Sequence, residues 1–267
     1  MALVRVGDVE LDVERSGSGP PLLLIMGMSG TALHWGEPFL DELRADFDVI
    51  AFDHRGVGAS SRLEGEITIE RMAADAAGLL AALEIESAHV LGISMGGMIA
   101  QELALAHPER VRTLTLGCTY CGGEGSALGP QEVMTVLAEA MMSGDRARAV
   151  RAGWEANVSA DFAADDRAWQ QFAAIAEQRA VAVEVVLAQV RAIAGHDTSA
   201  RLPSLEMPTL VIHGTEDQML PVANGRMISG LIPGAQLELL DGVGHLFFWE
   251  QPERSGELVR AHAAVRA

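Results

Sequence analysis

Short apolar runs alternate along this chain with longer stretches of helical character, and this alternation limits the folds open to it. Each run is too short for a typical helix, and most runs end at Gly or Asp. They lie at residues 20–27, 47–53, 89–93, 111–117, 208–214 and 235–242. A continuous apolar run suits a strand that is buried on both faces. Helices that connect such strands build a mostly parallel sheet with helices on both faces, so the sequence predicts an α/β fold.

Turn and cap residues mark the ends of several elements. VRVGDVELDV near the N-terminus predicts a β-hairpin that turns at Gly7-Asp8. Thr68 precedes IERMAADAAGLLAALE and predicts a helix N-cap. Pro108 ends the helix expected over MGGMIAQELALAH, and Pro221 suits the first turn of a helix over PVANGRMISGLI. These signals place helices between the predicted strands.

One long stretch breaks the alternation. Between residues 122 and 200 the apolar spacing is helical, and no segment favours a strand. Its first residues, GGEGSALGP (122–130), have the composition of a linker. We therefore predict a core in two parts, residues 1–121 and 201–267. Between them lies a helical insertion, residues 122–200, which is expected to cap the core.

Composition and charge narrow the classes of partner. A chain of 267 residues can bury one sizeable core. Its formal net charge of −18 disfavours nucleic acid and anionic membrane surfaces as partners. The N-terminus lacks the apolar stretch of a signal peptide, and no apolar run approaches the roughly 18 residues of a membrane span. We expect a cytoplasmic protein without a membrane or nucleic-acid partner, and the sequence does not indicate its oligomeric state.

Cys118 and Cys121 are the two cysteines of the chain and form a C-x-x-C pair in GCTYCGG. Two thiols cannot complete a tetrahedral zinc site, so no metal is expected. A redox pair is one interpretation of this spacing. Small cysteines that are buried without a chemical role are the other, and we favour it.

The most informative motif is HVLGISMGG (89–97), in which Ser94 stands between an expected buried strand and an expected helix. Such a junction leaves room only for a tight turn, and Gly92 and Gly96 have no Cβ to obstruct it. The helix would point its first N–H groups and its positive dipole end at the serine. This context favours a nucleophile elbow over a serine in an ordinary strand–helix turn. The dinucleotide-binding pattern G-x-G-x-x-G is incomplete, because RGVGASS (55–61) carries only its first two glycines.

A serine nucleophile needs a base, and the base needs an orienting acid. TEDQMLP follows the run PTLVIHG and offers Glu216 and Asp217, and VGHLFFWEQPE follows AQLELLDG and offers His245. The chain order serine, acid, histidine is that of enzymes with a nucleophile elbow. We predict Ser94, Asp217 and His245 as catalytic residues, with Glu216 as the rival acid.

The oxyanion of an acyl-transfer reaction needs hydrogen-bond donors as well. The candidates are two backbone N–H groups, that of Met95 after the serine and that of Met28 in the loop after PPLLLIMG. Apolar side chains nearby are expected to contact the substrate, and the alternative is that they fill the core. The predicted contacts are Trp154, Trp169, Met219 and Leu246.

HVLGISMGG, DHRGVGASS, VIHGTEDQMLP and GVGHLFFWEQPE, in this order, resemble the motifs of the α/β-hydrolase superfamily. The resemblance covers nearly the whole chain except the helical insertion. Within the superfamily the chain is most similar to small carboxylesterases and 3-oxoadipate enol-lactonase-like hydrolases. The resemblance implies the α/β-hydrolase fold, Ser94 as nucleophile, Asp217 as acid, His245 as base and no cofactor. It also implies structural roles for Asp53 and Arg55.

The sequence departs from the family pattern in the oxyanion loop. Many relatives carry His-Gly there, and this chain has Met26-Gly27. The Met28 N–H remains as a donor, but a histidine that commonly braces the loop is missing.

These residues predict hydrolysis of carboxylic esters of small to medium apolar substrates through an acyl-enzyme. The partner expected is therefore a small-molecule ester or lactone. An enol-lactonase or C–C bond hydrolase is an alternative, because arginines of the helical insertion could bind a substrate carboxylate: Arg146, Arg148, Arg151 and Arg179. A perhydrolase would use the same three residues. A hydrolase-fold protein that only binds ligands is the alternative from another class, and the complete triad disfavours it.

Overall fold

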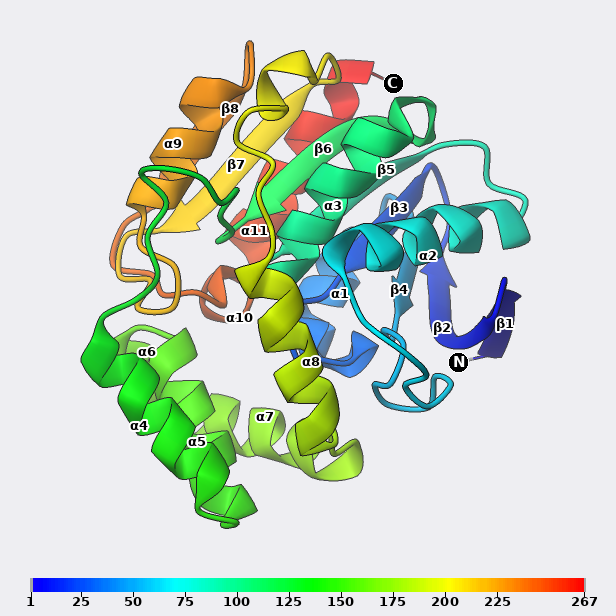
Figure 1. Ribbon diagram of the computed structural model, residues 1–267. Coiled ribbons are helices and arrows are strands. Elements are labelled where there is room, and N and C mark those ends of the chain that lie inside the picture. The colour runs from blue at the N-terminus through cyan, green and yellow to red at the C-terminus, as the bar shows by residue number, and fades with distance from the viewer. Residues whose placement is uncertain (1, 267) are drawn as a thin grey trace.

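An eight-stranded sheet forms the centre of the protein in the computed structural model, which describes residues 2–266 (Figure 1). The strand order is β1-β2-β4-β3-β5-β6-β7-β8. β2 pairs antiparallel with β1 and with β4, and the pairs from β4 to β8 are parallel. This confirms the predicted α/β fold with a mostly parallel sheet. The strands are β1 (Ala2–Val6), β2 (Val9–Gly17), β3 (Pro21–Ile25), β4 (Asp48–Phe52), β5 (Ala88–Ile93), β6 (Val111–Gly117), β7 (Thr209–Gly214) and β8 (Gln236–Leu240).

Helices cover both faces of the sheet, as Figure 1 shows for α2 and α3 in front of it and α11 behind it. Successive residues of β3 mark the two faces, because side chains alternate along a strand. Leu23 and Ile25 join one apolar core with α2, α3 and α9, whereas Leu22 and Leu24 join another with α1, α10 and α11. The core helices are α1 (Glu37–Arg44), α2 (Ile69–Ala82), α3 (Met95–Ala106), α9 (Ala223–Leu231), α10 (Phe247–Glu250) and α11 (Pro252–Ala263).

The hairpin turn and the helix cap that the sequence predicts are confirmed, and the start of one helix is shifted. β1 and β2 form a hairpin in which Val6 pairs with Val9, and Gly7 between them has a φ of 54°. Thr68 caps α2 by accepting the Arg71 N–H at 3.2 Å. α9 begins at Ala223, two residues later than Pro221 indicates.

The later start of α9 has a local cause. The Asn224 N–H donates to the carbonyl of Pro221, three residues back, at 2.9 Å. The chain after the proline therefore makes a tighter turn before the regular helix begins.

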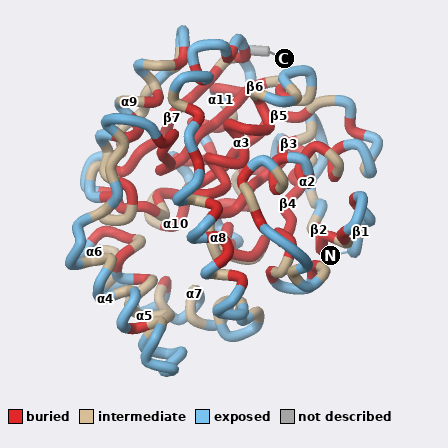
Figure 2. The backbone as a smooth tube through the Cα atoms, in the orientation of Figure 1, coloured by how far each residue is buried: buried red, intermediate tan, exposed pale blue. Residues whose placement is uncertain are grey.

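The helical insertion contributes five helices between β6 and β7, grouped at the lower left of Figure 1 except for α8, which runs back to the core. Figure 2 shows that α4 and α5 are largely exposed or intermediate, whereas the sheet is largely buried. At the base of the insertion, the Thr198 N–H donates to the carbonyl of Cys121 at 2.8 Å, so its two ends lie side by side. The helices are α4 (Gln131–Met142), α5 (Arg146–Asn157), α6 (Ala160–Ala163), α7 (Asp166–Gln178) and α8 (Val183–Ala194).

An ion-pair cluster ties the insertion to the core. Arg179, between α7 and α8, lies 2.6 Å from a carboxylate oxygen of Asp12 and 2.7 Å from one of Asp53. Asp53 also accepts the Ala32 N–H at 2.7 Å. Burial raises the pKa of Asp53, and the Ala32 N–H and Arg179 partly offset this effect. The nearby Arg55 guanidinium donates to both carboxylate oxygens of Asp75. Together these contacts are those of a structural turn.

Cys118 and Cys121 are both free and buried. Burial is the largest influence on each thiol and raises the pKa of both, which keeps them protonated. Within residues 2–266, no helix is both long and apolar enough to cross a membrane.

Candidate active site

Ser94 occupies a sharp turn between β5 and α3. Its φ of 55° lies in the left-handed region, which is strained for a residue with a Cβ. A Cβ on Gly92 would lie 2.2 Å from the carbonyl oxygen of Gly96, and a Cβ on Gly96 would lie 1.9 Å from the carbonyl oxygen of Ile25. Both positions therefore require glycine, as the motif indicates. The turn is the geometry of a nucleophile elbow.

Backbone hydrogen bonds fix the elbow against the next strand. The Ser94 N–H donates to the Gly117 carbonyl at the end of β6 (2.9 Å), and the Thr119 hydroxyl donates to the Ser94 carbonyl (2.7 Å). Met95 is the first residue of α3, so its N–H has no partner within the helix. That N–H is the donor expected beside the serine.

Asp217 and His245 form a buried pair beyond β7 and β8. One carboxylate oxygen of Asp217 lies 2.7 Å from Nδ1 of His245, and the other accepts the N–H groups of Met219 (2.8 Å) and Leu220 (2.9 Å). Burial alone would raise the pKa of Asp217. The charges and hydrogen bonds of His245 and His213 outweigh it and hold that pKa well below its usual value. Asp217 is therefore ionised, as an acid that orients an imidazole must be.

The neighbouring Glu216 lies differently. Glu216 is exposed, and its backbone N–H donates to the Val243 carbonyl at 2.9 Å. Of the two adjacent carboxylates, Asp217 is the one that contacts His245.

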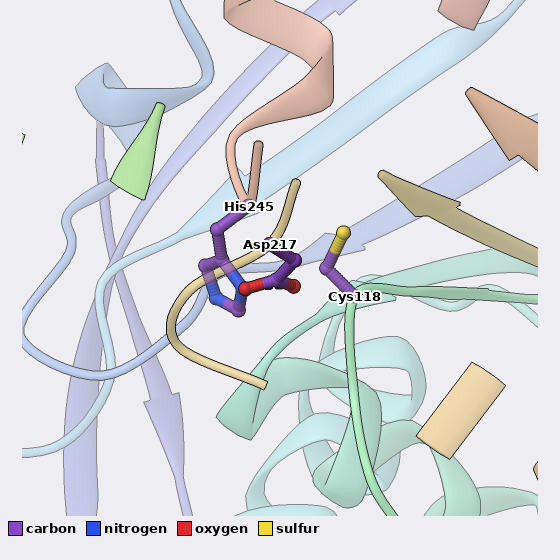
Figure 3. Close-up of side chains that lie close together, drawn as sticks. All are labelled: Cys118, Asp217 and His245. Carbon is purple, nitrogen blue, oxygen red and sulfur yellow. Dashed lines mark hydrogen bonds and ion pairs between the residues drawn. The ribbon is translucent and has the colours of Figure 1, made fainter. Parts of the chain in front are cut away.

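The elbow and the buried pair meet through Cys118, the residue after Gly117. Its Sγ, the Asp217 carboxylate and a ring nitrogen of His245 all lie within 4.8 Å of one another. Figure 3 shows Asp217 between His245 and Cys118. Among the described residues, no hydrogen bond joins Ser94 Oγ to His245, and such bonds often form only when substrate is bound.

Cys118 is the site residue that sequence reasoning missed, because it follows a strand that supplies no residue to the expected triad. The group of Cys118, Asp217 and His245 does not fit a metal ion. Burial and the charge of Asp217 keep the pKa of the Cys118 thiol well above the usual value, and Nδ1 of His245 is engaged with Asp217. A cation would have to displace the thiol proton inside the protein.

The predicted oxyanion loop lies against the serine. A Cβ on Gly27 would be 3.1 Å from Cβ of Ser94. The Gly27 carbonyl accepts the Gly30 N–H across a tight turn at 3.3 Å. The C=O and N–H of a trans peptide point in opposite directions, so the Met28 N–H points out of this turn.

A histidine does brace this loop, although it comes from another strand. Nε2 of His54 lies 2.8 Å from the Met26 carbonyl oxygen, and the ring is buried after β4. This contact supplies a support in place of the His-Gly that the sequence lacks.

The four predicted substrate contacts lie in two environments. Met219 and Leu246 flank the buried pair and are half-buried. Trp154 is fully buried among aromatic rings, with the Phe172 centroid at 5.0 Å and that of Trp249 at 5.9 Å. Trp169 is half-buried, and the Arg151 guanidinium lies 4.8 Å from the centre of its ring. Contact of these residues with substrate stays a prediction.

The two tryptophans are expected to respond differently to truncation. Trp154→Ala should lower the free energy of unfolding by about 3–5 kcal/mol, because it leaves a cavity in the aromatic cluster. Trp169→Ala should instead change the preference for acyl chain length, by roughly 10- to 200-fold at most. Urea unfolding and kinetics on a series of p-nitrophenyl esters measure the two effects. An unchanged chain-length profile in Trp169→Ala would assign that ring to the core.

Comparisons with known proteins extend over the same residues. A family model described as alpha/beta hydrolase fold matches residues 20–252. A relative from Azorhizobium caulinodans, provisionally named carbamate hydrolase RutD, is 33% identical over an alignment of 269 positions that covers 97% of this chain and 97% of the relative. The 3-oxoadipate enol-lactonase 1 of Acinetobacter baylyi is 27% identical, over 91% of this chain and 89% of its own.

A solved structure shows the same architecture. The esterase RhEst1 from Rhodococcus sp. ECU1013 matches with a TM-score of 0.86 at 27% sequence identity, over 99% of this chain and 98% of that one. The likeness therefore includes the helical insertion as well as the sheet.

Proposed function

Since the chain belongs to the alpha/beta hydrolase fold family, we propose that it cleaves carboxylic esters of small to medium apolar substrates through an acyl-enzyme. Ser94 is the nucleophile, His245 the base and Asp217 the acid that orients the base. The observation that carries the proposal is the strained backbone of Ser94, which hydrogen-bonds to Gly117 while the next residue, Cys118, lies beside the buried Asp217–His245 hydrogen bond.

Each proton has a defined place in this reaction. Asp217 holds Nδ1 of His245, which leaves Nε2 free to take the proton of Ser94 as its oxygen attacks the ester carbonyl. The tetrahedral intermediate then breaks its bond to the leaving alcohol, and His245 returns the proton to that alcohol. Water gives its proton to His245 and attacks the acyl carbon. The acid leaves, and the proton returns to Ser94.

Two backbone donors stabilise the oxyanion. The Met95 N–H lies at the positive end of α3, and the Met28 N–H points out of the turn that faces Ser94. Because both are backbone groups, only a substitution by proline at these positions would remove the donor. Removal of one such donor from a serine hydrolase typically costs about 10²–10³ in kcat.

The contacts of the insertion arginines favour an uncharged substrate. Arg179 pairs with Asp12 and Asp53. Arg151 pairs with Glu155 at 2.6 Å, and the Arg146 guanidinium donates to a backbone carbonyl. An enol-lactonase or dienoate hydrolase needs a cation for the substrate carboxylate, and these three are engaged with the chain itself. Arg148, the fourth candidate, is exposed and makes no side-chain hydrogen bond or ion pair among the described residues.

A fluorophosphonate probe tests the reaction class directly. The protein should be labelled at one serine, and peptide mapping should place the label on Ser94. Turnover of a panel of neutral p-nitrophenyl esters, lactones, carbamates and ring-cleavage dienoates then orders the substrate classes, with the neutral esters expected first.

Two results would contradict the proposal. Protein that stays unlabelled and inactive across the panel would indicate a ligand-binding role. Labelled protein with a preference for dienoates or carboxylated lactones would keep the nucleophile but change the substrate class.

A further inference from the structure

The oxyanion loop, residues 26–32, is held at both ends by the core. Nε2 of His54 lies 2.8 Å from the Met26 carbonyl oxygen at its start, and the Ala32 N–H donates to Asp53 at its end (2.7 Å). Both partners follow β4 and lie in one buried turn. The ends of the loop are therefore fixed by the turn after β4, in which Asp53 also pairs with Arg179 of the helical insertion.

The middle of the loop is strained. Ser29 has a φ of 56°, and it is the third residue of the turn that Gly27 and Gly30 close. A positive φ at this position, without one at Met28, is the pattern of a type II turn, which normally carries Gly or Asn there. The left-handed conformation is unfavourable for a serine, because its Cβ crowds the backbone. The turn therefore needs an outside contact to stay in this form.

That contact comes from the helical insertion. The Ser29 N–H donates to Oε1 of Gln189 at 2.9 Å, although the two residues are 160 positions apart. Gln189 lies on α8 and is fully buried, and its neighbours Ala188 and Ala192 pack into the sheet core. It is the link between the insertion and the turn that carries the proposed oxyanion donor.

The rest of the Gln189 amide supports a functional reason for this residue. Its Nε2 group is buried and has no hydrogen-bond partner among the described residues. A buried donor without a partner destabilises the folded protein, and a leucine of similar size would avoid this loss. Stability alone therefore does not favour glutamine at this position.

We propose that Gln189 is a positioning residue that completes the oxyanion hole. By accepting the Ser29 N–H it holds the turn in its strained form, and the strained form sets where the Met28 N–H points. The hole is then fully formed only while α8 is docked on the core. This inference rests on the proposed function and adds that the helical insertion takes part in catalysis and not only in substrate selection.

The test compares Gln189→Leu with Val185→Ala. Val185 is a buried residue of the same helix that packs near Gly56 and makes no hydrogen bond to the loop, so its truncation controls for looser packing of α8. Gln189→Leu should lower kcat for a p-nitrophenyl ester by about 10- to 100-fold, because a small misplacement of an oriented group costs this much. KM should change by less than about threefold. Val185→Ala should stay within about threefold of the unaltered protein in kcat.

Two further measurements separate positioning from structural damage. A trifluoromethyl ketone forms an oxyanion when the serine adds to it. In Gln189→Leu its inhibition constant should therefore rise by the same factor by which kcat/KM falls. The matching methyl ketone, which binds without forming the oxyanion, should keep its affinity. Adding Ser29→Gly to Gln189→Leu should restore part of kcat, because glycine adopts positive φ without strain.

The outcomes separate this inference from the proposed function. Unaltered protein that neither reacts with fluorophosphonate nor turns over esters would overturn the function itself. Active protein in which Gln189→Leu has normal kcat and normal trifluoromethyl ketone affinity would overturn only the role of Gln189. Failure of Ser29→Gly to restore any activity would overturn it as well, because the turn would then not be the route of the effect.

Discussion

Ser94→Ala is expected to lower kcat for ester turnover by about 10⁴- to 10⁶-fold while leaving the fold intact. The hydroxyl is the attacking group in the proposed reaction, and no other group in the elbow can replace it. The fold should survive because alanine fits the same backbone, and the elbow is held by the Ser94 N–H and carbonyl bonds to Gly117 and Thr119. Steady-state kinetics on a p-nitrophenyl ester, with circular dichroism to check folding, measure both effects.

A serine elsewhere provides the control. Ser229 is half-buried on α9, and its hydroxyl donates to the backbone carbonyl of Arg226 in its own helix, so Ser229→Ala should leave kcat unchanged. Near-normal kcat in Ser94→Ala would remove the basis of the proposed function.

Asp217→Asn is expected to lower kcat by roughly 10³- to 10⁴-fold, the scale that a wrong histidine tautomer produces in serine proteases. The substitution keeps the shape of the side chain but removes the charge that holds the Nδ1–H of His245 at 2.7 Å. Nε2 would then carry the proton in part of the molecules and could not accept one from Ser94. The same kinetic assay applies.

Glu216→Gln is the matched control, one residue away. Glu216 is exposed, so removal of its charge should change kcat by less than about tenfold. The reverse ranking of the two variants would transfer the role of the acid to Glu216. Near-normal activity in both would mean that the orienting carboxylate comes from another strand.

The features that the sequence could predict are those that neighbouring residues determine. The strands follow from continuous apolar runs. The elbow follows from Ser94 between two glycines, at which a Cβ would clash with backbone atoms. Asp217 and His245 follow from their positions after β7 and β8. In each case the structure is set within about ten residues of the motif, which is the range over which sequence patterns carry information.

The features that the sequence could not predict join distant segments. Cys118 lies beside Asp217 only because β6 and β7 are neighbours in the sheet. Arg179 is one of four arginines that the lactonase or C–C bond hydrolase alternative offers for a substrate carboxylate, but buried carboxylates 126 and 167 positions away hold it. Trp154 packs against Trp249 from the last part of the chain. Such contacts depend on how the helical insertion docks, and no local spacing specifies that.

The junction between Cys121 and Thr198 has a consequence for how proteins of this kind diversify. Because the two stems meet where Thr198 donates its N–H (2.8 Å) and its hydroxyl (3.3 Å) to the Cys121 carbonyl, we expect the segment between them to be exchangeable as a module. The entropy of closing a loop changes only slowly with its length, so a longer or shorter module would fit the same stems at little cost. The elbow and the Asp217–His245 pair lie outside the module and would be inherited unchanged. Selection could therefore alter residues 122–197 of the helical insertion, apart from the proposed positioning residue Gln189, while the residues proposed for bond cleavage stay fixed.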